Sequence, residues 1–410
     1  MQIKLILSSL RHHRMATTLI GLQIALTLAI VCNALFIVQQ RLEHIARPTG
    51  IDEKNIVVVH NQWLGQFTTE QMNAMTLSDL AALRRLPGVA DAYSDYTYPA
   101  VGLSAQLSSV RYTRDQPKKT SYAETYYADD HTLSTLGLRL IAGRNFRPDE
   151  VTAVSDADNF TPPVIIITRD LAERLFQHES AVGRAIYIGE SPSTIVGVIE
   201  HLEVPANGTH SFAYCSILLP LRNGNFNSSG SYYLLRADRG QVNSVIRAAP
   251  AVLLRLNRRR ILDEQGGAQR YTDLRAAGYA SDRGMTVLLG MISAVLLAAT
   301  VGGIVGLSSF WVGQRQKQIG IRRAVGATRG DILRYFQMEN LLIVGFGIAL
   351  GMLLAVTLSL ALMKYYELPR LPLYYLPFGA LALFVLGQLA VLGPALRAAA
   401  VPPVVATRSV

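Results

Sequence analysis

Four long stretches without a charged residue dominate the hydrophobic pattern of this 410-residue chain. They cover residues 15–40, 284–314, 340–363 and 371–396. Each exceeds the roughly 20 residues that a helix needs to cross the hydrocarbon core of a bilayer. The pattern therefore predicts four transmembrane helices. The first is longer than the apolar region of a signal peptide, so we interpret it as an uncleaved anchor.

Residues 41–283, between the first two predicted membrane helices, have the mixed pattern of a water-soluble domain. A short β-branched run at 56–60 predicts a strand. An apolar stripe at helical spacing follows, and Thr76 and Asp79 have the spacing of a capping box at its start. A second strand is predicted over 90–98, which completes a β-α-β unit.

The same order of elements recurs near the end of this domain. A strand is predicted over 231–237, a helix over 240–256 with a break at Pro250, and a strand over 260–263. Two β-α-β halves so far apart in the sequence predict one small subdomain with a second subdomain inserted between them.

The predicted insertion covers residues 103–220. Its β-branched runs at 164–168 and 194–199 predict strands, and residues 170–176 predict a short helix. The polar, helix-compatible residues 269–283 are expected to form a stalk that leads into the second membrane helix.

The fold class predicted from these patterns is an α-helical membrane protein with four transmembrane helices and a mixed α+β domain of two subdomains between the first and the second. The predicted parts are residues 1–40 (cytoplasmic N-terminus and first helix), 41–283 (outer domain, with halves 51–102 and 221–268, insertion 103–220 and stalk 269–283), 284–314 (second helix), 315–334 (cytoplasmic segment), 335–363 (third helix), 364–370 (short outer loop), 371–396 (fourth helix) and 397–410 (cytoplasmic tail).

The net charge of +10 is unevenly distributed along the chain. Residues 41–283 hold 26 Lys/Arg and 26 Asp/Glu, so the whole excess lies outside the predicted domain. Positive residues flank membrane helices preferentially on the cytoplasmic side. Both termini and the segment 315–334 are therefore expected in the cytoplasm, with the domain on the other side. The basic pI follows from this topology, and no nucleic-acid partner is expected. The excess positive charge outside residues 41–283 is carried mainly by Lys4, Arg11, Arg14, Arg315, Lys317, Arg322, Arg323, Arg329, Arg334, Arg397 and Arg408.

The sequence contains no recognisable catalytic or metal-binding motif. The dipeptide Gly-Lys of a P-loop does not occur, and neither does H-E-x-x-H or C-x-x-C. The two cysteines, Cys32 and Cys215, fall in different predicted parts, so no disulfide is expected. We therefore expect a non-catalytic chain with no catalytic residues, no metal site and no cofactor of its own.

The cytoplasmic segment 315–334 contains more than a topology signal requires. A short surface helix is predicted over 316–326, with Gly326-Ala327 as a corner. Thr328 and Asp331 have capping-box spacing, which predicts that a new helix starts at Thr328 and continues into the third membrane helix. One alternative is contact with anionic lipid alone. The apolar Ile-Gly-Ile within a basic surround favours a docking surface.

Small residues recur at four-residue spacing in two of the membrane helices. Such positions let helices approach closely, so a packing role is expected for them. They are Ala298, Gly302 and Gly306 in the second helix and Gly347 and Gly351 in the third.

The stretch QRQKQIGIRRAVGATRGDILRYFQMENLLI (residues 314–343) resembles the cytoplasmic segment of MacB/FtsX-type ABC transporter permeases. LRHHRMATTLIGLQIAL resembles the family's entry into its first helix, and LRLIAGRNF with the run ERLF…VGRAIYIG…TIVGVI resembles the MacB-type periplasmic domain. PALRAAAVPPVVATRSV is similar to the family's C-terminal end. The resemblance covers most of the chain.

This resemblance implies a dimeric permease of the bacterial inner membrane that works with two copies of an ABC ATPase. The second permease is implied to be another copy or a related chain. ATP and Mg²⁺ would be bound by the ATPase. This chain starts almost at its first helix, so the ATPase is expected on a separate chain. The family's usual acidic residue before Ile-Gly-Ile is replaced here by Gln318. By resemblance, the ATPase-coupling residues are Ile319, Gly320, Ile321, Arg322, Arg323, Ala324, Gly326 and Ala327.

The implied function is mechanotransmission, in which ATP binding and hydrolysis move the periplasmic domain to expel a peptide, drug or other small molecule. A periplasmic adaptor and an outer-membrane channel are implied as further partners. Two alternatives remain at this level: a lipoprotein-sorting permease of the LolC/LolE kind, and an FtsX-like regulator of a cell-wall hydrolase.

Overall fold

The computed structural model describes residues 14–100, 106–116, 119–154, 161–177, 179–204, 212–222, 230–262, 267–366 and 370–400. The predicted terminal segments 1–13 and 401–410 and residues 367–369 of the predicted outer loop lie outside this range. The chain divides into two compact units. One is Ala46–Ser281, and the other combines Met1–Ile45 with Asp282–Val410.

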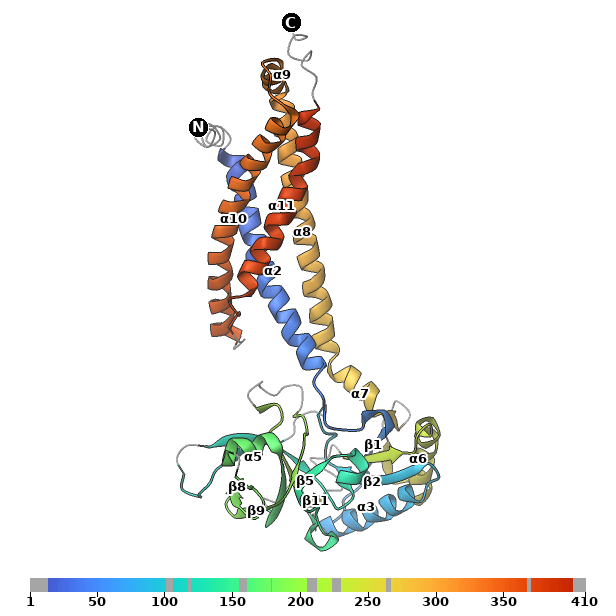
Figure 1. Cartoon of the computed structure of the whole chain (residues 1–410). Coiled ribbons are helices and arrows are strands. Elements are labelled where there is room, and N and C mark those ends of the chain that lie inside the picture. Colours follow the sequence, from blue (N-terminus) through green and yellow to red (C-terminus); the bar gives the residue numbers. More distant parts are fainter. Residues whose placement is uncertain are drawn as a thin grey trace. The chain divides into compact units, whose positions relative to one another are not determined.

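The helical unit contains, in the part of the chain that the structure describes, four helices long and apolar enough to cross a membrane (Figure 1). A short helix lies between the second and the third. The helices are α2 (Arg14–Ile45), α8 (Ala280–Gln314), the short α9 (Gln316–Ala324), α10 (Arg329–Tyr366) and α11 (Tyr375–Ala399).

Several helices extend beyond the predicted membrane boundaries. The first reaches Ile45 rather than residue 40, and the third continues without a break from a helix start at Arg329, as the capping box at Thr328 predicts. At this start the Thr328 amide donates to the Asp331 carboxylate (3.0 Å) and the Asp331 amide donates to the Thr328 hydroxyl (3.2 Å). This reciprocal cap satisfies two free amides, so the helix can start at this point in the polar segment.

The close helix contact of this unit is made by α10 on α2. A Cβ atom on Gly347 would lie 2.9 Å from the carbonyl oxygen of Gly21, and one on Gly351 would lie 2.9 Å from that of Ala25. Only residues without a side chain permit this approach. The four-residue spacing of Gly347 and Gly351 thus lies on the face that contacts α2.

The small residues of α8 occupy a different environment. Ala298, Gly302 and Gly306 are exposed, and among the described residues a Cβ on Gly302 or Gly306 would meet nothing within 4 Å. The close packing predicted for these glycines is therefore not made within the chain, because α10 rather than α8 supplies the tight partner of α2. Any packing role at this stripe requires a second molecule.

Polar contacts also join the membrane helices. The Thr27 and Thr300 hydroxyls lie 2.8 Å apart between α2 and α8. The Asn33 amide donates to the Ala355 carbonyl of α10 at 3.1 Å. Asp282 of α8 pairs with Arg41 (2.6 Å) and lies 2.9 Å from His44, both on α2.

The first sheet of the other unit has the strand order β13-β1-β12-β2, with β14 pairing to β1. Both β1 and β2 run antiparallel to β12, which lies between them. This arrangement is a split β-α-β fold, as the two separated halves of the sequence predict. Its elements are η1 (Glu53–Asn55), β1 (Ile56–Trp63), α3 (Thr69–Arg84), β2 (Val89–Asp95), β12 (Ser231–Ala237), α6 (Val242–Leu256), β13 (Arg260–Leu262) and β14 (Gln269–Arg270).

Two local predictions for this subdomain are wrong. The helix α3 is capped by Thr68 with Gln71, about two turns before the predicted box. Asp79 is instead buried within the helix, where it accepts two hydrogen bonds from Arg260 (2.7 and 2.9 Å) and one from the Tyr233 hydroxyl (2.7 Å). The helix α6 continues through Pro250, because its buried face, which includes Ala249 and Leu253, packs against the sheet on both sides of that residue.

The inserted subdomain is a mixed sheet in the order β3-β4-β10-β7-β9-β5, with β8 pairing to β9. A small ladder joins β6 and β11. The elements of the inserted subdomain are β3 (Gln106–Val110), β4 (Ser121–Tyr127), α4 (Thr132–Leu136), β5 (Leu140–Gly143), η2 (Pro148–Glu150), β6 (Thr152–Ala153), β7 (Val164–Thr168), α5 (Arg169–Phe176), β8 (Ala185–Tyr187), β9 (Pro192–Ile199), β10 (Ser216–Leu219) and β11 (Leu221–Arg222).

One of the three hydrophobic cores among the described residues of this unit is common to both subdomains. It contains Val58 and Leu234 of the first sheet together with Ile166 and Leu218 of the second. Tyr271 also belongs to it and is fully buried. The predicted stalk 269–283 is therefore not free: its first residues form β14, and Tyr271 anchors α7 (Tyr271–Gly278) in the core. With four apolar helices and this α+β domain between the first two, the predicted fold class is confirmed.

A buried carboxyl group lies where the segment after α2 meets the inserted subdomain. The Glu203 amide donates to the Thr49 carbonyl (3.0 Å), and the Tyr126 hydroxyl donates to the Glu203 carbonyl (3.2 Å). Four residues after Thr49, Glu53 pairs with Arg275 of α7 at 2.6 Å. Burial raises the pKa of the Glu203 side chain to about 8, against the opposing charges of Arg275 and Arg47.

The glycine contact between α2 and α10 predicts a position-specific effect. Gly351→Leu should lower the thermal unfolding temperature of the detergent-purified chain, because overpacking at a closed contact costs about 1–3 kcal/mol. Gly290→Leu is the matched control, since a Cβ there meets no described atom within 4 Å. A Cβ on Gly302 also meets no described atom within 4 Å. If Gly302→Leu impairs only self-association, the small-residue face of α8 contacts a second chain. Equal stability of Gly351→Leu and Gly290→Leu would contradict the packing.

The raised pKa of Glu203 predicts a pH-dependent stability of the α+β unit. An unfolded glutamate has a pKa of about 4.3. Between about pH 5 and 8 the folded chain therefore holds a proton that the unfolded chain has released, and stability falls as pH rises, by up to about 1.4 kcal/mol per pH unit. Glu203→Gln should reduce this slope, measured by hydrogen exchange of residues 121–127 in the full chain. The exposed Glu173→Gln should leave it unchanged, and an unaltered slope in Glu203→Gln would refute the assignment.

Candidate functional site

The short helix α9 lies between two membrane helices and continues almost directly from the first of them. Only Arg315 separates it from α8, and the Arg315 amide still donates to the carbonyl oxygens of Trp311 (3.1 Å) and Val312 (3.3 Å). At its other end Gly326 has a φ of +107°, a conformation that side-chain-bearing residues rarely adopt. The chain turns there and enters α10 at the Thr328 cap.

The inner face of α9 is packed against its own chain. Ile319 is 5% exposed and belongs to a hydrophobic cluster with Phe336 of α10 and Ala395 of α11. Gly320 is buried beside it. The expectation that Ile319 inserts into a partner is therefore wrong: this side chain holds α9 on the helical unit.

A buried ion pair fixes the junction between α8 and α9. One guanidinium nitrogen of Arg315 donates to both carboxylate oxygens of Glu339 on α10, at 3.0 and 3.1 Å. Charge-assisted hydrogen bonds of this kind are among the stronger ones in proteins. The Arg315 guanidinium also lies 5.7 Å from the centre of the Trp311 ring. The pair therefore joins the residue that follows α8 to the third turn of α10.

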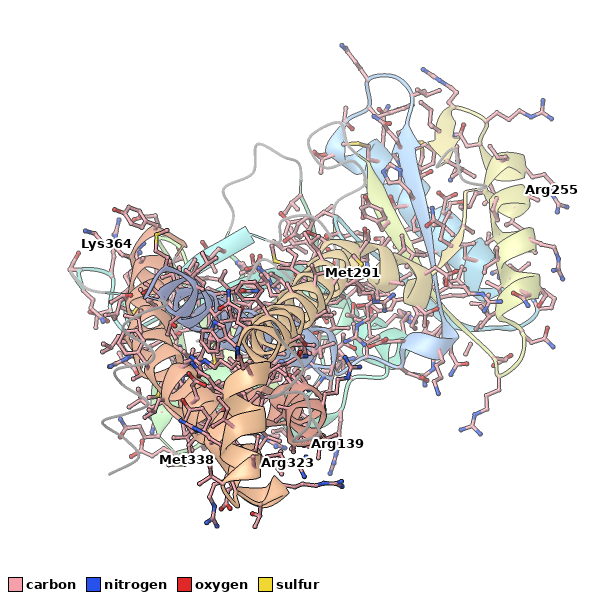
Figure 2. The ribbon with its side chains drawn as sticks, turned by 90° about the horizontal axis from the view of Figure 1, so that it is seen from above. Arg139, Arg255, Met291, Arg323, Met338 and Lys364 are labelled. Carbon is pink, nitrogen blue, oxygen red and sulfur yellow. The ribbon has the colours of Figure 1, made fainter. Side chains whose placement is uncertain are left out.

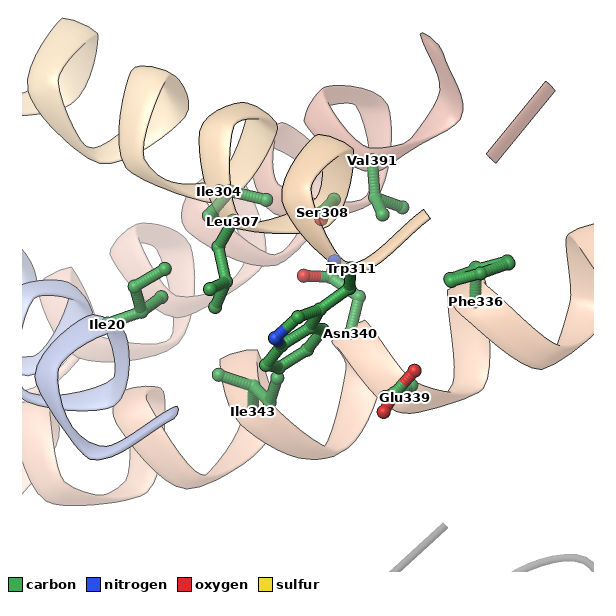
Figure 3. A pocket seen from close by; sticks show the side chains of 10 residues that line it. All are labelled: Ile20, Ile304, Leu307, Ser308, Trp311, Phe336, Glu339, Asn340, Ile343 and Val391. Atoms are coloured by element: carbon green, nitrogen blue, oxygen red, sulfur yellow. The ribbon is translucent and has the colours of Figure 1, made fainter. Parts of the chain in front are cut away.

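The pair borders a small cavity that four helices surround. Figure 3 shows Trp311 and Ser308 of α8 facing Glu339 and Asn340 of α10, with Val391 of α11 beside them. The Asn340 amide donates to the Gly387 carbonyl of α11 at 2.9 Å. Polar groups thus connect α8, α10 and α11 at one level of the helical unit.

The outer face of α9 presents apolar residues within a basic surround. Ile321 is 50% exposed and Val325 is 85% exposed. Arg322 is exposed and lies over the Tyr335 ring at 5.0 Å, whereas Arg323 is half-buried; Figure 2 views the chain from this end and labels Arg323. We call Ile321, Arg322, Arg323 and Val325 the α9 surface. Of the other predicted coupling residues, Ala324 and Gly326 are exposed and Ala327 is half-buried.

Sequence reasoning missed two parts of this site. Val325 is not among the predicted coupling residues, although it is the most exposed apolar side chain of the segment. The Arg315–Glu339 pair was missed because the two residues lie 24 positions apart. A signal existed: Arg315 directly follows one charge-free stretch and Glu339 directly precedes the next. Among the described residues, no group of three or more His, Cys, Asp and Glu side chains gathers to hold a metal.

Comparison with known families assigns both units. The MacB-like periplasmic core domain family matches residues 15–255, more than half of the chain, and the FtsX-like permease C-terminal family matches residues 290–403. The chain belongs to the MacB-like permeases. The unit Ala46–Ser281 is accordingly a periplasmic domain, and the resemblance noted in the sequence is confirmed.

Individual relatives agree with this family. The macrolide export ATP-binding/permease protein MacB of Chromobacterium violaceum is 24% identical over 367 residues, which cover 87% of this chain and 52% of the relative. The uncharacterized ABC transporter permease YknZ of Bacillus subtilis is 23% identical over 367 residues, or 85% of each chain. The periplasmic region of MacB from Actinobacillus actinomycetemcomitans aligns with 57% of this chain and 96% of its own, at 14% identity and a TM-score of 0.35. The chain spans about half the length of the curated MacB relatives it matches.

Proposed function

We propose that this chain is the permease of a mechanotransmission-type ABC transporter, and that the α9 surface docks on an ATPase that binds ATP and Mg²⁺. One observation supports this above the others. Ile321 and Val325 are exposed at the end of a helix whose opposite face is anchored by Ile319 and whose start is fixed by the Arg315–Glu339 pair. An anchored helix with an apolar outer face has the properties of a docking element.

The charges of the segment define the chemistry of the partner. Residues 316–334 contain five basic residues and one acidic residue. A partner surface with an apolar cleft and an acidic rim complements this pattern. Binding energy in interfaces is usually concentrated in desolvated central anchors, while charges at the rim guide association. Ile321 and Val325 are the proposed anchors, and Arg322 and Arg323 the rim.

Force from the docked ATPase has a continuous route into the membrane helices. Ile319 and its neighbours pack α9 against α10 and α11. The Arg315–Glu339 pair links the start of α9, at the end of α8, to α10. The helix α8 is joined through α7 to the periplasmic domain. Movement of α9 is therefore proposed to reach that domain along packed and covalently connected elements. Two ATPase copies and a second permease, identical or related, complete the proposed assembly.

The proposed cargo is a peptide, a drug or another small molecule that is expelled from the periplasm. The names of the MacB relatives refer to macrolide export, which supports this class of cargo. A periplasmic adaptor and an outer-membrane channel are further proposed partners. We place the chain in the inner membrane with both termini in the cytoplasm, in agreement with its distribution of basic residues.

The docking proposal predicts that Ile321→Asp lowers permease-stimulated ATP hydrolysis by at least about tenfold, because an unpaired charge in a docking surface costs several kcal/mol. Stimulation is measured in proteoliposomes with the ATPase that co-purifies with the native chain. Leu107→Asp is the matched control: Leu107 is 49% exposed but belongs to the periplasmic domain, and its substitution should leave stimulation unchanged.

Ile319→Asp separates docking from folding. Because Ile319 is buried in its own chain, this variant should lower the unfolding temperature, whereas Ile321→Asp should not. If Ile321→Asp and Val325→Asp both retain the stimulation of the unmodified chain, the α9 surface is not the docking site. If no ATPase accompanies the chain, the proposed function itself is wrong.

A further inference from the structure

An apolar groove with a volume of about 520 Å³ lies between α2 and α11, and Leu297 of α8 also lines it. Leu28, Cys32 and Leu35 contribute to one wall, and Phe378 and Leu386 to the other. Of the described residues that line it, none is charged. The groove takes no part in the proposed docking of α9.

The depth of the groove matches one leaflet of a bilayer. Its α2 wall runs from Leu28 to Gln39 and its α11 wall from Tyr375 to Leu386. Each covers eleven helical steps, or about 16 Å. The hydrocarbon core is about 30 Å thick, so each wall covers roughly half of it. The Tyr375 hydroxyl donates to the Gln39 side chain, so the two opposite walls end at the same level.

Polar groups are confined to one end of this groove. Gln39, Tyr374 and Tyr375 form the rim at the end where α2 continues to Ile45 and the chain enters the periplasmic domain. Tyrosine is enriched at the membrane–water interface, where its hydroxyl meets the headgroup layer. The exposed Arg370 precedes Tyr374 by four residues, within about 14 Å along the chain, and lines a neighbouring hollow with Ser359 and Leu360 of α10. A polar mouth above an apolar channel matches a phospholipid, which has a polar headgroup and apolar acyl chains.

The contact between α2 and α11 depends on a small residue on the groove wall. A Cβ atom on Gly379 would lie 2.5 Å from the Cys32 sulfur, so the helices meet closely there. Ala382, one turn further along α11, is also small and lines the groove. Larger side chains at these positions would fill the space that remains beside the contact. An apolar space of this size does not favour water.

We propose that the groove binds one acyl chain of a phospholipid from the periplasmic leaflet. The headgroup lies at the rim of Gln39, Tyr374 and Tyr375, and its phosphate pairs with Arg370. Because the acyl chain comes from surrounding hydrocarbon, the apolar walls give little net binding energy. The walls select the shape of the chain, and the polar rim supplies the preference over bulk lipid.

Photo-crosslinking tests this site in proteoliposomes that hold the full chain and a phosphatidylglycerol with a diazirine on one acyl chain. Mass spectrometry should find labels on the groove residues 28–39 and 374–386 at about five times the yield on the exposed face of α10, because the polar rim of the groove holds the lipid in place. Ala382→Trp fills the groove and should reduce groove labelling by at least about fivefold.

Ala349→Trp is the matched control, because Ala349 is an exposed alanine of α10 outside the groove; it should leave groove labelling unchanged. Arg370→Gln should weaken labelling by the anionic lipid, with unchanged unfolding temperature. Uniform labelling of all exposed helix surfaces, or groove labelling that survives Ala382→Trp, would overturn the proposal. So would a disulfide between two chains at Phe378→Cys in a Cys32→Ala background, since a second copy would then occupy the groove. None of these outcomes depends on ATPase stimulation.

Discussion

The ion pair between Arg315 and Glu339 is the constraint on which the arrangement of the α9 end of the helical unit depends. Both side chains are largely buried, and removing one partner of such a pair costs about 3–5 kcal/mol because the other charge is left unpaired. The pair therefore holds the end of α8 against α10 and fixes the point from which α9 starts. Neighbouring Asn340 extends the polar connection to α11.

The position of α9 follows from this joint together with a hydrophobic contact. With its start fixed at Arg315, the helix turns Ile319 inward onto Phe336, and the next apolar residues, Ile321 and Val325, face outward. The positive φ of Gly326 then allows the chain to enter α10. The outward face is thus anchored on three membrane helices, one of which leads into the periplasmic domain.

Long-range pairing limits what could be predicted from the sequence. The four membrane helices and the split β-α-β order follow from charge-free length and from the recurrence of local patterns, and both agree with the structure. The roles of Ile319 and Ile321 could not be separated, because both are apolar residues in one short helix and only the tertiary contact with α10 and α11 decides which is buried.

Local rules also failed where a buried polar contact replaced a local one. Thr76 and Asp79 have the spacing of a cap, but Asp79 is held inside the helix by Arg260, far along the chain. Gly302 and Gly351 share the same small-residue spacing. Only Gly351 meets another helix of this chain, because α10 rather than α8 lies closest to α2.

A charge-reversal cycle on the joint tests the account most directly. Arg315→Glu and Glu339→Arg, each alone, place like charges together and should each reduce permease-stimulated ATP hydrolysis by at least about tenfold and lower the unfolding temperature, because a buried charge is left without its partner. The double variant restores opposite charges and should recover most of the stimulation. Wild-type stimulation in either single variant, or a stable double variant that remains uncoupled, would contradict the claim that this pair carries α9 on the membrane helices.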